Sequence, residues 1–201
     1  RMYSERNHAG CTGGDGCPSR SFTDLNTGVW YHPYTDYVIS HSLMRGLSST
    51  LFAPNQSMTR GMMVTTLYRL AGEPQVEGTA TFQDVKSSAY YANAVAWAEA
   101  NGIAKGVDTG VFAPNAPVTR EQAAAFAYRY VTAYLGKTPA PGASLGGFQD
   151  AGLVSDYAAE SLSWAHAAGL MVGYGDGFLG PKDTVTRAQM AKLLTLLAQN
   201  F

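Results

Sequence analysis

The chain contains three copies of one sequence pattern, and this repetition constrains its fold more than any other feature. The segment that opens at Phe22 is matched without a gap by a second that opens at Phe82, sixty positions later. A third copy opens at Phe148 and, after one inserted residue, keeps an offset of 67 from the second. Tandem units of this size stack on their neighbours because one unit alone buries too little apolar surface. The sequence therefore predicts one body built from three related units.

These units are called repeats one, two and three. They cover residues 22–72, 82–131 and 148–199. Two linkers join them, and the second is the longer and contains two prolines. Residues 1–21 contain Gly, Ser and Arg without periodicity, which is typical of a linker or tail.

Each repeat is predicted to contain two helices. The first helices are expected at residues 33–41, 92–101 and 158–168. In repeats two and three they stop at Gly102 and Gly169, whereas repeat one has Ser42 there and should end less sharply. The second helix carries an apolar stripe at i, i+3, i+4 and i+7. Three stripes facing one another predict an all-α fold of three tandem two-helix repeats, packed as a pseudo-three-fold helical prism.

A loop with a recurring glycine lies between the two helices of each repeat. The glycines are Gly46, Gly106 and Gly173. A glycine at a fixed loop position indicates either a positive φ or a close approach of backbone. Each glycine is followed by a Phe or Leu that stands two residues before a Pro, and we expect that apolar side chain to plug the loop onto the core.

A Thr-Arg pair begins each second helix and is a candidate anion site. The arginines are Arg60, Arg120 and Arg187. The Thr is the predicted N-cap, and in repeats two and three a Gln three residues later completes a capping box. An Arg beside the exposed N–H groups and positive dipole end of a helix suits an anion, although a salt bridge to a neighbouring repeat is the alternative. Repeat one lacks the Gln and has Gly61, so we place most weight on Arg120 and Arg187.

The composition argues against several classes of protein. A net charge of -1, with 14% charged residues and no basic run, argues against nucleic-acid binding. No stretch approaches 18 consecutive apolar residues, so we expect no insertion into a membrane. The chain begins with Arg, which we interpret as a piece of a larger parent protein.

Motifs of catalysis and metal binding are not evident in the sequence. The four histidines lack the His-Glu-x-x-His spacing, and neither Gly-x-Ser-x-Gly nor a phosphate loop occurs. We therefore expect no enzyme, no cofactor and no metal. Cys11 and Cys17 are the two cysteines. Separated by a glycine-rich segment, they could close a disulfide ring in an oxidising exterior, or they could be free thiols.

The order of motifs in each repeat resembles that of the S-layer homology domain. These motifs are Phe-x-Asp-Val and an aromatic residue, an Ala- and Trp-rich helix, Gly-Ile-x-x-Gly, Phe-x-Pro-Asn and Val-Thr-Arg-x-Gln. The resemblance covers residues 22 to about 199 and implies a helical prism whose inter-repeat grooves bind secondary cell-wall polysaccharide, often through a pyruvate ketal on an amino sugar. It implies a non-catalytic anchor that holds an exported protein at the cell wall or S-layer.

The resemblance also implies a set of glycan-binding residues. They are Arg60, Arg120 and Arg187, then Asp24, Asp84 and Asp150, then Trp30, Tyr90 and Tyr157, and the glycines Gly46, Gly106 and Gly173. An Arg fork binds a carboxylate, an aromatic ring covers the C–H face of a sugar, and an Asp accepts from sugar hydroxyls. The aspartates could equally cap the opening turn. The alternative function is a protein-interaction or self-assembly module of a surface layer, which would show an exposed apolar patch.

Overall fold

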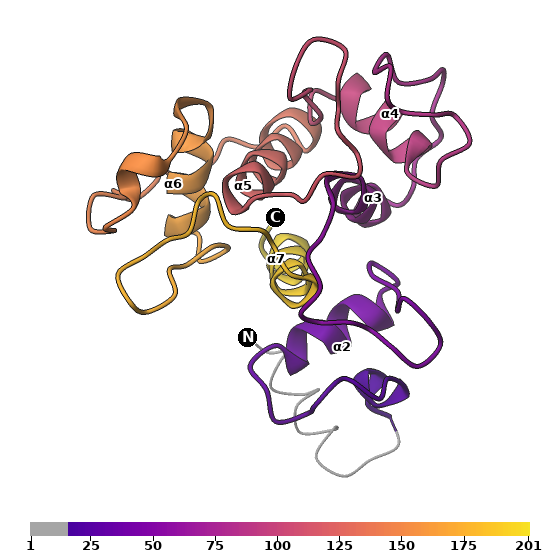
Figure 1. Cartoon of the computed structure of the whole chain (residues 1–201), viewed down its shortest axis with the longest axis vertical. Coiled ribbons are helices and arrows are strands. Elements are labelled where there is room, and N and C mark those ends of the chain that lie inside the picture. Colours follow the sequence, from indigo (N-terminus) through magenta and orange to yellow (C-terminus); the bar gives the residue numbers. More distant parts are fainter. Residues whose placement is uncertain (1–15) are drawn as a thin grey trace. The chain divides into compact units, whose positions relative to one another are not determined.

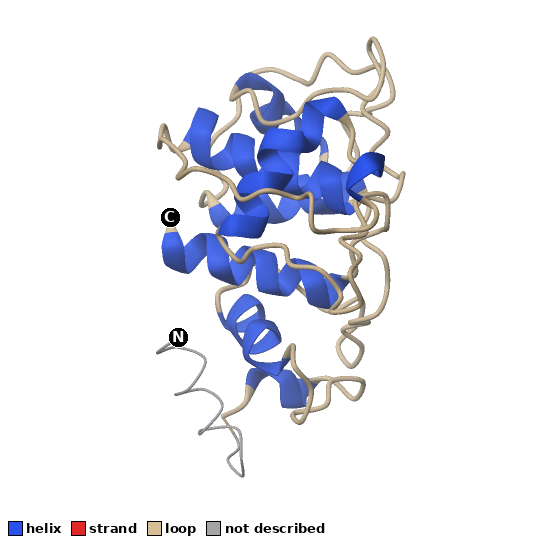
Figure 2. Ribbon diagram, turned by 90° about the vertical axis from the view of Figure 1, so that its left-hand side faces the viewer, coloured by secondary structure: helices blue, strands red, loops and turns tan. Residues whose placement is uncertain are grey.

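The computed structural model describes residues 16–201, and over these residues it contains six α-helices (Figure 1). They are α2 (His32–Ser40), α3 (Arg60–Leu70), α4 (Ala92–Ala100), α5 (Arg120–Arg129), α6 (Ala159–Ala167) and α7 (Arg187–Asn200). The shorter turns are η1 (Pro18–Ser21), η2 (Tyr130–Tyr134), η3 (Ala151–Leu153) and η4 (Asp156–Ala158). The described residues contain isolated β-bridges but no sheet (Figure 2). The prediction of an all-α fold with two helices per repeat is confirmed.

The second helix of every repeat begins at the Arg of its Thr-Arg pair, as predicted. On α5 the Thr119 side chain accepts from the N–H of Gln122 (3.3 Å), and the Gln122 side chain accepts from the N–H of Thr119 (3.2 Å). Thr186 makes the same reciprocal pair on α7. On α3, Thr59 accepts from Met62 N–H (3.1 Å). Met62 has no side-chain acceptor to return the bond, so repeat one keeps the cap but not the box.

The first helices end in the same way in all three repeats. Gly102 and Gly169 have φ of 72°, and Ser42 adopts φ of 56° at the matching position. The prediction that the first helix of repeat one ends less sharply was wrong. The N–H of Leu43 donates to the carbonyl of Val38 (2.9 Å), the bond that also closes α4 and α6. This contact holds Ser42 in a left-handed conformation that costs a non-glycine residue about 1 kcal/mol or more.

Helices pair between repeats rather than within them. The chain divides into two compact units, one running up to Ser57 and including Thr186–Asn200, the other Met58–Val185 with Phe201. In the first unit α2 packs against α7, and in the second α3 packs against α4 and α5 against α6. Each pair therefore joins the first helix of one repeat to the second helix of another. This exchange explains why a single repeat cannot bury its own apolar stripe.

The predicted core residues are buried. Trp97 and Trp164 are 3% and 2% exposed, and the loop plugs Phe52, Phe112 and Leu179 are fully buried. The ring of Trp97 packs against Tyr68 of α3, with centroids 5.5 Å apart, and that of Trp164 packs against Tyr128 of α5 at 5.4 Å. Both contacts join the helix pairs described above.

Residues 17–21, which the sequence analysis assigned to the tail, pack onto α2. Ser19 is buried, and its N–H donates to the carboxylate of Asp36 (3.0 Å). Thr35 contacts the same serine, with its hydroxyl oxygen 2.9 Å from Ser19 Oγ. A single 3-10 turn has no apolar period, so the repeat pattern could not reveal that it belongs to the folded unit.

A charged cluster around the buried Glu121 ties repeat two to repeat three. The Glu121 carboxylate accepts from the N–H of Ser155 (2.9 Å), the Ser155 hydroxyl (2.7 Å) and the Lys182 ammonium (2.6 Å). Burial raises the pKa of Glu121, but the hydrogen bonds from Lys182 and Ser155 outweigh burial and hold the pKa below its usual value. The ionised carboxylate is therefore part of the folded state.

We expect Glu121→Gln to lower the free energy of unfolding by about 1 to 3 kcal/mol at neutral pH, because it removes a charge-assisted bond. The folded pKa lies below the unfolded one, so this contribution is full above the unfolded pKa of about 4.3 and is lost as the pH falls through the folded pKa. Urea unfolding of both proteins from about pH 7 to about pH 3 checks this. The free energies of unfolding of wild type and Glu121→Gln should converge as the pH falls. A difference that stays constant would contradict the role of the charge.

Candidate functional site

Arg60 is buried, and its guanidinium is fixed by the loop of the next repeat. Its side chain is 4% exposed. Nε donates to the carbonyl of Phe112 (2.8 Å), and Nη2 donates to the carbonyl of Lys105 (3.1 Å). The guanidinium carbon lies 4.8 Å from the ring centroid of Phe112 and 5.1 Å from that of Phe126. The Arg of repeat one therefore belongs to a site built mainly by repeat two.

Arg120 and Arg187 are held in the same way. Arg120 donates to the carbonyls of Leu179 (3.0 Å) and Val172 (2.6 Å) in the loop of repeat three. Arg187 donates from Nε to the carbonyl of Phe52 (2.8 Å) and from Nη2 to that of Arg45. The alternative given in the sequence analysis was a salt bridge from each Arg to a neighbouring repeat. The bonds described here do join each Arg to another repeat, but their acceptors are main-chain carbonyls. Burial lowers the pKa of Arg120, yet a guanidinium remains charged near neutral pH.

The three aspartates hold the loops that receive these arginines. Asp84 accepts from the successive N–H groups of Phe112 (2.9 Å) and Ala113 (2.7 Å). Asp24 and Asp150 make the same pair of bonds in the loops of repeats one and three, at 2.7 to 2.9 Å. At Asp150 the hydrogen bond from the N–H of Leu179 is the main reason that the carboxyl pKa lies below its usual value. These bonds hold the loop ahead of the second helix, a role that neither sequence alternative, sugar binding or capping of the opening turn, had named.

The loop glycines allow a close approach of backbone. Gly46, Gly106 and Gly173 are not among the glycines with positive φ. A Cβ on Gly106 would lie 2.5 Å from the carbonyl oxygen of Val111 and 2.7 Å from that of Asp108. Loop carbonyls and the first Phe of each repeat close in the other two glycines in the same way. The sequence left open a positive φ or a close approach of backbone at these glycines, and the structure shows the close approach.

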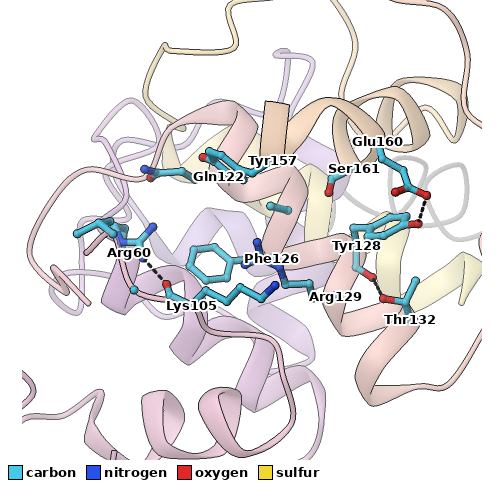
Figure 3. Close-up of a pocket in the computed structure, with 13 residues that line it drawn as sticks. Arg60, Lys105, Gln122, Phe126, Tyr128, Arg129, Thr132, Tyr157, Glu160 and Ser161 are labelled. Atoms are coloured by element: carbon cyan, nitrogen blue, oxygen red, sulfur yellow. Dashed lines mark hydrogen bonds between the residues drawn. The ribbon is translucent and has the colours of Figure 1, made fainter. Parts of the chain in front are cut away.

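A cavity of about 680 Å³ lies beside Arg60 (Figure 3). All three repeats contribute to its lining, which comprises Arg60, Lys105, Gly106, Val107, Gln122, Ala125, Phe126, Tyr128, Arg129, Thr132, Tyr157, Glu160 and Ser161. Its volume is in the range of cavities that hold small ligands. The three repeats, which cannot fold singly, therefore also build this cavity together.

The cavity carries an excess of positive charge. Arg60, Lys105 and Arg129 supply cations, and Glu160 supplies the carboxylate of the lining. Glu160 accepts from the hydroxyl of Tyr128 (2.9 Å). In the part of the chain that the structure describes, none of these three cations forms an ion pair. The lining suits an anionic ligand that also presents hydroxyls and apolar faces.

The cavity brings together some of the predicted site residues but not all of them. Arg60, Gly106 and Tyr157 line it. Trp30 and Tyr90 are 57% and 65% exposed and lie outside its lining. Of the remaining predicted residues, Asp84 holds the loop of repeat two, and the others belong to the equivalent loops of repeats one and three, as described above.

Part of the lining was not predicted from the sequence, since neither Lys105 nor Arg129 was selected as a site residue. The signal that could have found Arg129 is the i, i+3, i+4, i+7 set of Gln122, Ala125, Phe126 and Arg129, which runs beside the apolar stripe of α5 and lines the cavity.

The glycine at the start of α3 has a packing role. A Cβ on Gly61 would lie 3.0 Å from the ring of Tyr91 and 3.0 Å from the carbonyl oxygen of Pro114. The N–H of Gly61 donates to that same carbonyl (2.8 Å). The glycine that weakens the predicted helix start therefore allows a close contact with repeat two.

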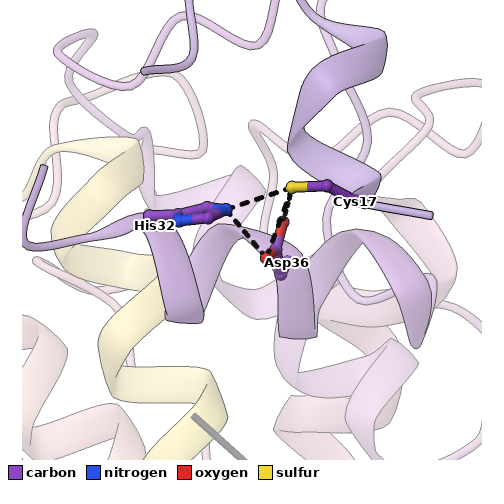
Figure 4. Close-up of side chains that lie close together, drawn as sticks. All are labelled: Cys17, His32 and Asp36. Carbon is purple, nitrogen blue, oxygen red and sulfur yellow. Dashed lines mark hydrogen bonds and ion pairs between the residues drawn. The ribbon is translucent and has the colours of Figure 1, made fainter. Parts of the chain in front are cut away.

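A second cluster of polar side chains joins α2 to Cys17, the residue before η1 (Figure 4). Cys17 Sγ is 3.1 Å from His32 Nε2, which is 2.9 Å from Asp36 Oδ2. All three are buried, and their spacing is close enough for a metal ion. Cys17 has no free thiol, however, so it offers no thiolate ligand. The predicted pairing of Cys17 with Cys11 lies outside the described residues and stays a prediction.

The chain matches the S-layer homology domain over residues 21–62, 81–124 and 147–191. It belongs to the S-layer homology domain family. An endoglucanase of Bacillus sp. (strain KSM-635) is 34% identical over 176 residues, which are 88% of this chain and 18% of the enzyme. The surface-layer 125 kDa protein of Lysinibacillus sphaericus is 31% identical over 166 residues, 81% of this chain and 14% of that protein. The chain thus spans less than a fifth of either relative.

S-layer homology domains are non-catalytic parts of larger surface proteins that bind the cell wall. An amylopullulanase of Thermoanaerobacterium thermosulfurigenes shares the domain at 30% identity, over 87% of this chain and 9% of the enzyme. The match with enzymes and surface-layer proteins covers this domain alone. The chain is therefore a cell-surface anchoring module. Among the described residues, no helix has the length and apolarity to cross a membrane.

Proposed function

We propose that this S-layer homology domain anchors its parent protein by binding an acidic secondary cell-wall polysaccharide. A pyruvate ketal on an amino sugar is the group that fits the cavity beside Arg60. The observation that carries this proposal is the cavity itself, which combines tyrosine rings with cations that form no ion pair among residues 16–201. The module works outside the cell and takes no part in catalysis.

Arg60 is suited to hold the ketal carboxylate. A guanidinium has five N–H donors, and two backbone carbonyls take one each, so further donors remain for a ligand. An exposed ion pair contributes about 0 to 1 kcal/mol, but a partly buried guanidinium held in place loses less entropy and is less screened. The hydrogen bonds that hold the loop thereby also orient the cation.

Tyr157 and Glu160 are suited to hold the sugar. Tyr157 lines the cavity and remains 54% exposed, so its ring can cover the C–H face of a pyranose. Glu160 and the side chain of Gln122 offer acceptors for hydroxyl groups and for an amide.

The repetition of the Arg site supports a multivalent anchor. Arg120 and Arg187 are fixed by loops in the same way as Arg60, and Trp30 and Tyr90 are exposed aromatics that can hold further sugars. We propose that Asp24, Asp84 and Asp150 contribute by shaping these loops. Several weak contacts along one polymer add through effective concentration, so a long polysaccharide should bind more tightly than its repeating unit.

We expect Tyr157→Ala to weaken the affinity for isolated pyruvylated wall polysaccharide by about 3- to 10-fold, because it removes the ring that covers the sugar. Titration calorimetry checks this. Leu153→Ala is the matched control, since Leu153 is 59% exposed and lies outside the cavity lining. Equal affinity of Tyr157→Ala and wild type would contradict the assignment of the sugar to this cavity.

A further inference from the structure

Lys105 and Arg129 place two more cations in the cavity that Arg60 lines. Lys105 comes from the loop after α4 and Arg129 from the end of α5. Figure 3 shows the Lys105 side chain extending past Phe126 toward Arg129. Arg129 Nη1 donates to the carbonyl of Ile103 (3.3 Å), which fixes the guanidinium at the cavity wall. Two like charges directed toward each other repel unless an anion lies between them.

The fold does not require charge at these two positions. At the constant offsets between repeats, Lys105 and Arg129 correspond to Arg45 and Arg69 in repeat one. In repeat three they correspond to Val172 and Leu196. The two positions are therefore both cationic or both apolar within a repeat. An apolar pair serves the same loop and helix in repeat three, so packing alone does not explain the two charges. Two positions that are charged together or apolar together form the pattern of a pair that acts together on a ligand.

The charge balance of the cavity points the same way. Three cations and the single carboxylate of Glu160 leave an excess of two positive charges in the lining. A ketal carboxylate at Arg60 neutralises one of them. The other excess positive charge lies on Lys105 and Arg129. Lys105 is exposed, so its side chain can reach a ligand from solvent.

We infer that Lys105 and Arg129 form a second anion clamp, so that the cavity takes an oligosaccharide with two negative groups. One is the ketal carboxylate at Arg60, and the other is a carboxylate or a phosphate on the neighbouring sugar. This inference rests on the proposed function and names its ligand more narrowly. Arg60 is coupled to the clamp because its Nη2 donates to the main-chain carbonyl of Lys105.

The test uses three synthetic disaccharides and calorimetric titration of the whole chain. Each carries a pyruvate ketal on an amino sugar, linked to a neutral hexose, a hexuronate or a hexose phosphate. Wild type should bind the hexuronate or the phosphate probe at least 10-fold more tightly than the neutral one. The probe with the greater gain identifies the second anion.

The double variant Lys105→Val with Arg129→Leu carries the residue types that repeat three has at the equivalent positions, Val172 and Leu196. In this variant the preference for the hexuronate or phosphate probe over the neutral-hexose probe should fall below about 2-fold. Lys105→Val alone, at an exposed position, should lose about half of the preference on a logarithmic scale. Lys86→Ala with Lys137→Ala removes two exposed charges away from the cavity and should keep the full preference, and circular dichroism shows that each variant is folded.

Three results would overturn the inference while leaving the proposed function intact. Wild type that binds the three probes equally would rule out the second clamp. A double variant that keeps the preference would place the second anion elsewhere, and a control pair that loses the preference would assign the effect to net charge. Failure of all three probes to bind wild type would overturn the proposed function together with the inference.

Discussion

Replacing Arg60 with alanine is expected to lower the free energy of unfolding by about 3 kcal/mol. The substitution removes the donors that satisfy the carbonyls of Phe112 and Lys105, and the Phe112 carbonyl lies in the interior. A buried acceptor that loses its charged donor bears its full desolvation cost, and the guanidinium also leaves the faces of two phenylalanine rings. Urea denaturation followed by circular dichroism measures the change.

Arg60→Lys is the informative companion of that variant. It keeps the charge but cannot donate to two carbonyls with the planar fork, so its stability should fall between that of wild type and Arg60→Ala. A loss below about 1 kcal/mol in Arg60→Ala would mean that water replaces the guanidinium at both carbonyls, and the fixed orientation proposed for the site would be wrong.

Phe112→Ala is expected to lower the free energy of unfolding by about 3 to 5 kcal/mol. Phe112 is fully buried, and its ring lies 5.3 Å from that of Phe82 and 6.3 Å from that of Phe126. The substitution leaves a cavity in the unit that contains the Arg60 site. It also loosens the loop whose carbonyl orients Arg60. Thermal and urea unfolding should both show the loss.

The matched control for Phe112 is already present in the chain. Repeat three has Leu179 at the equivalent position, and it is also fully buried. Phe112→Leu should therefore cost less than about 1.5 kcal/mol, since it largely conserves volume. A cost for Phe112→Ala similar to that of Phe112→Leu would show that the site collapses around the smaller side chain.

The helices could be predicted because their boundaries depend on local contacts. Thr119 and Gln122 are three residues apart and determine the start of α5 without reference to the rest of the chain. Gly102 ends α4 through its own backbone conformation. Ser42 shows the limit of this reasoning. A residue type that disfavours a left-handed φ still adopts it when the surrounding hydrogen bonds require it.

The assembly of the site depends on contacts that spacing does not reveal. Arg60 bonds to carbonyls 45 and 52 positions further along the chain, so its partner repeat cannot be read from one motif. Gly61 appeared to weaken a cap because the ring of Tyr91 that covers it is distant in sequence. The repeated Thr-Arg pair supplied Arg60, the resemblance supplied the ligand class, and the structure supplied the neighbours of Arg60.

We propose that this module holds a surface protein to the wall through its polysaccharide, and co-sedimentation of the chain with purified cell-wall sacculi tests this, with sacculi stripped of the polysaccharide as the comparison. The chain should sediment with intact sacculi, stay in solution with stripped sacculi and be released by added soluble polysaccharide. Equal sedimentation with intact and stripped sacculi would contradict it.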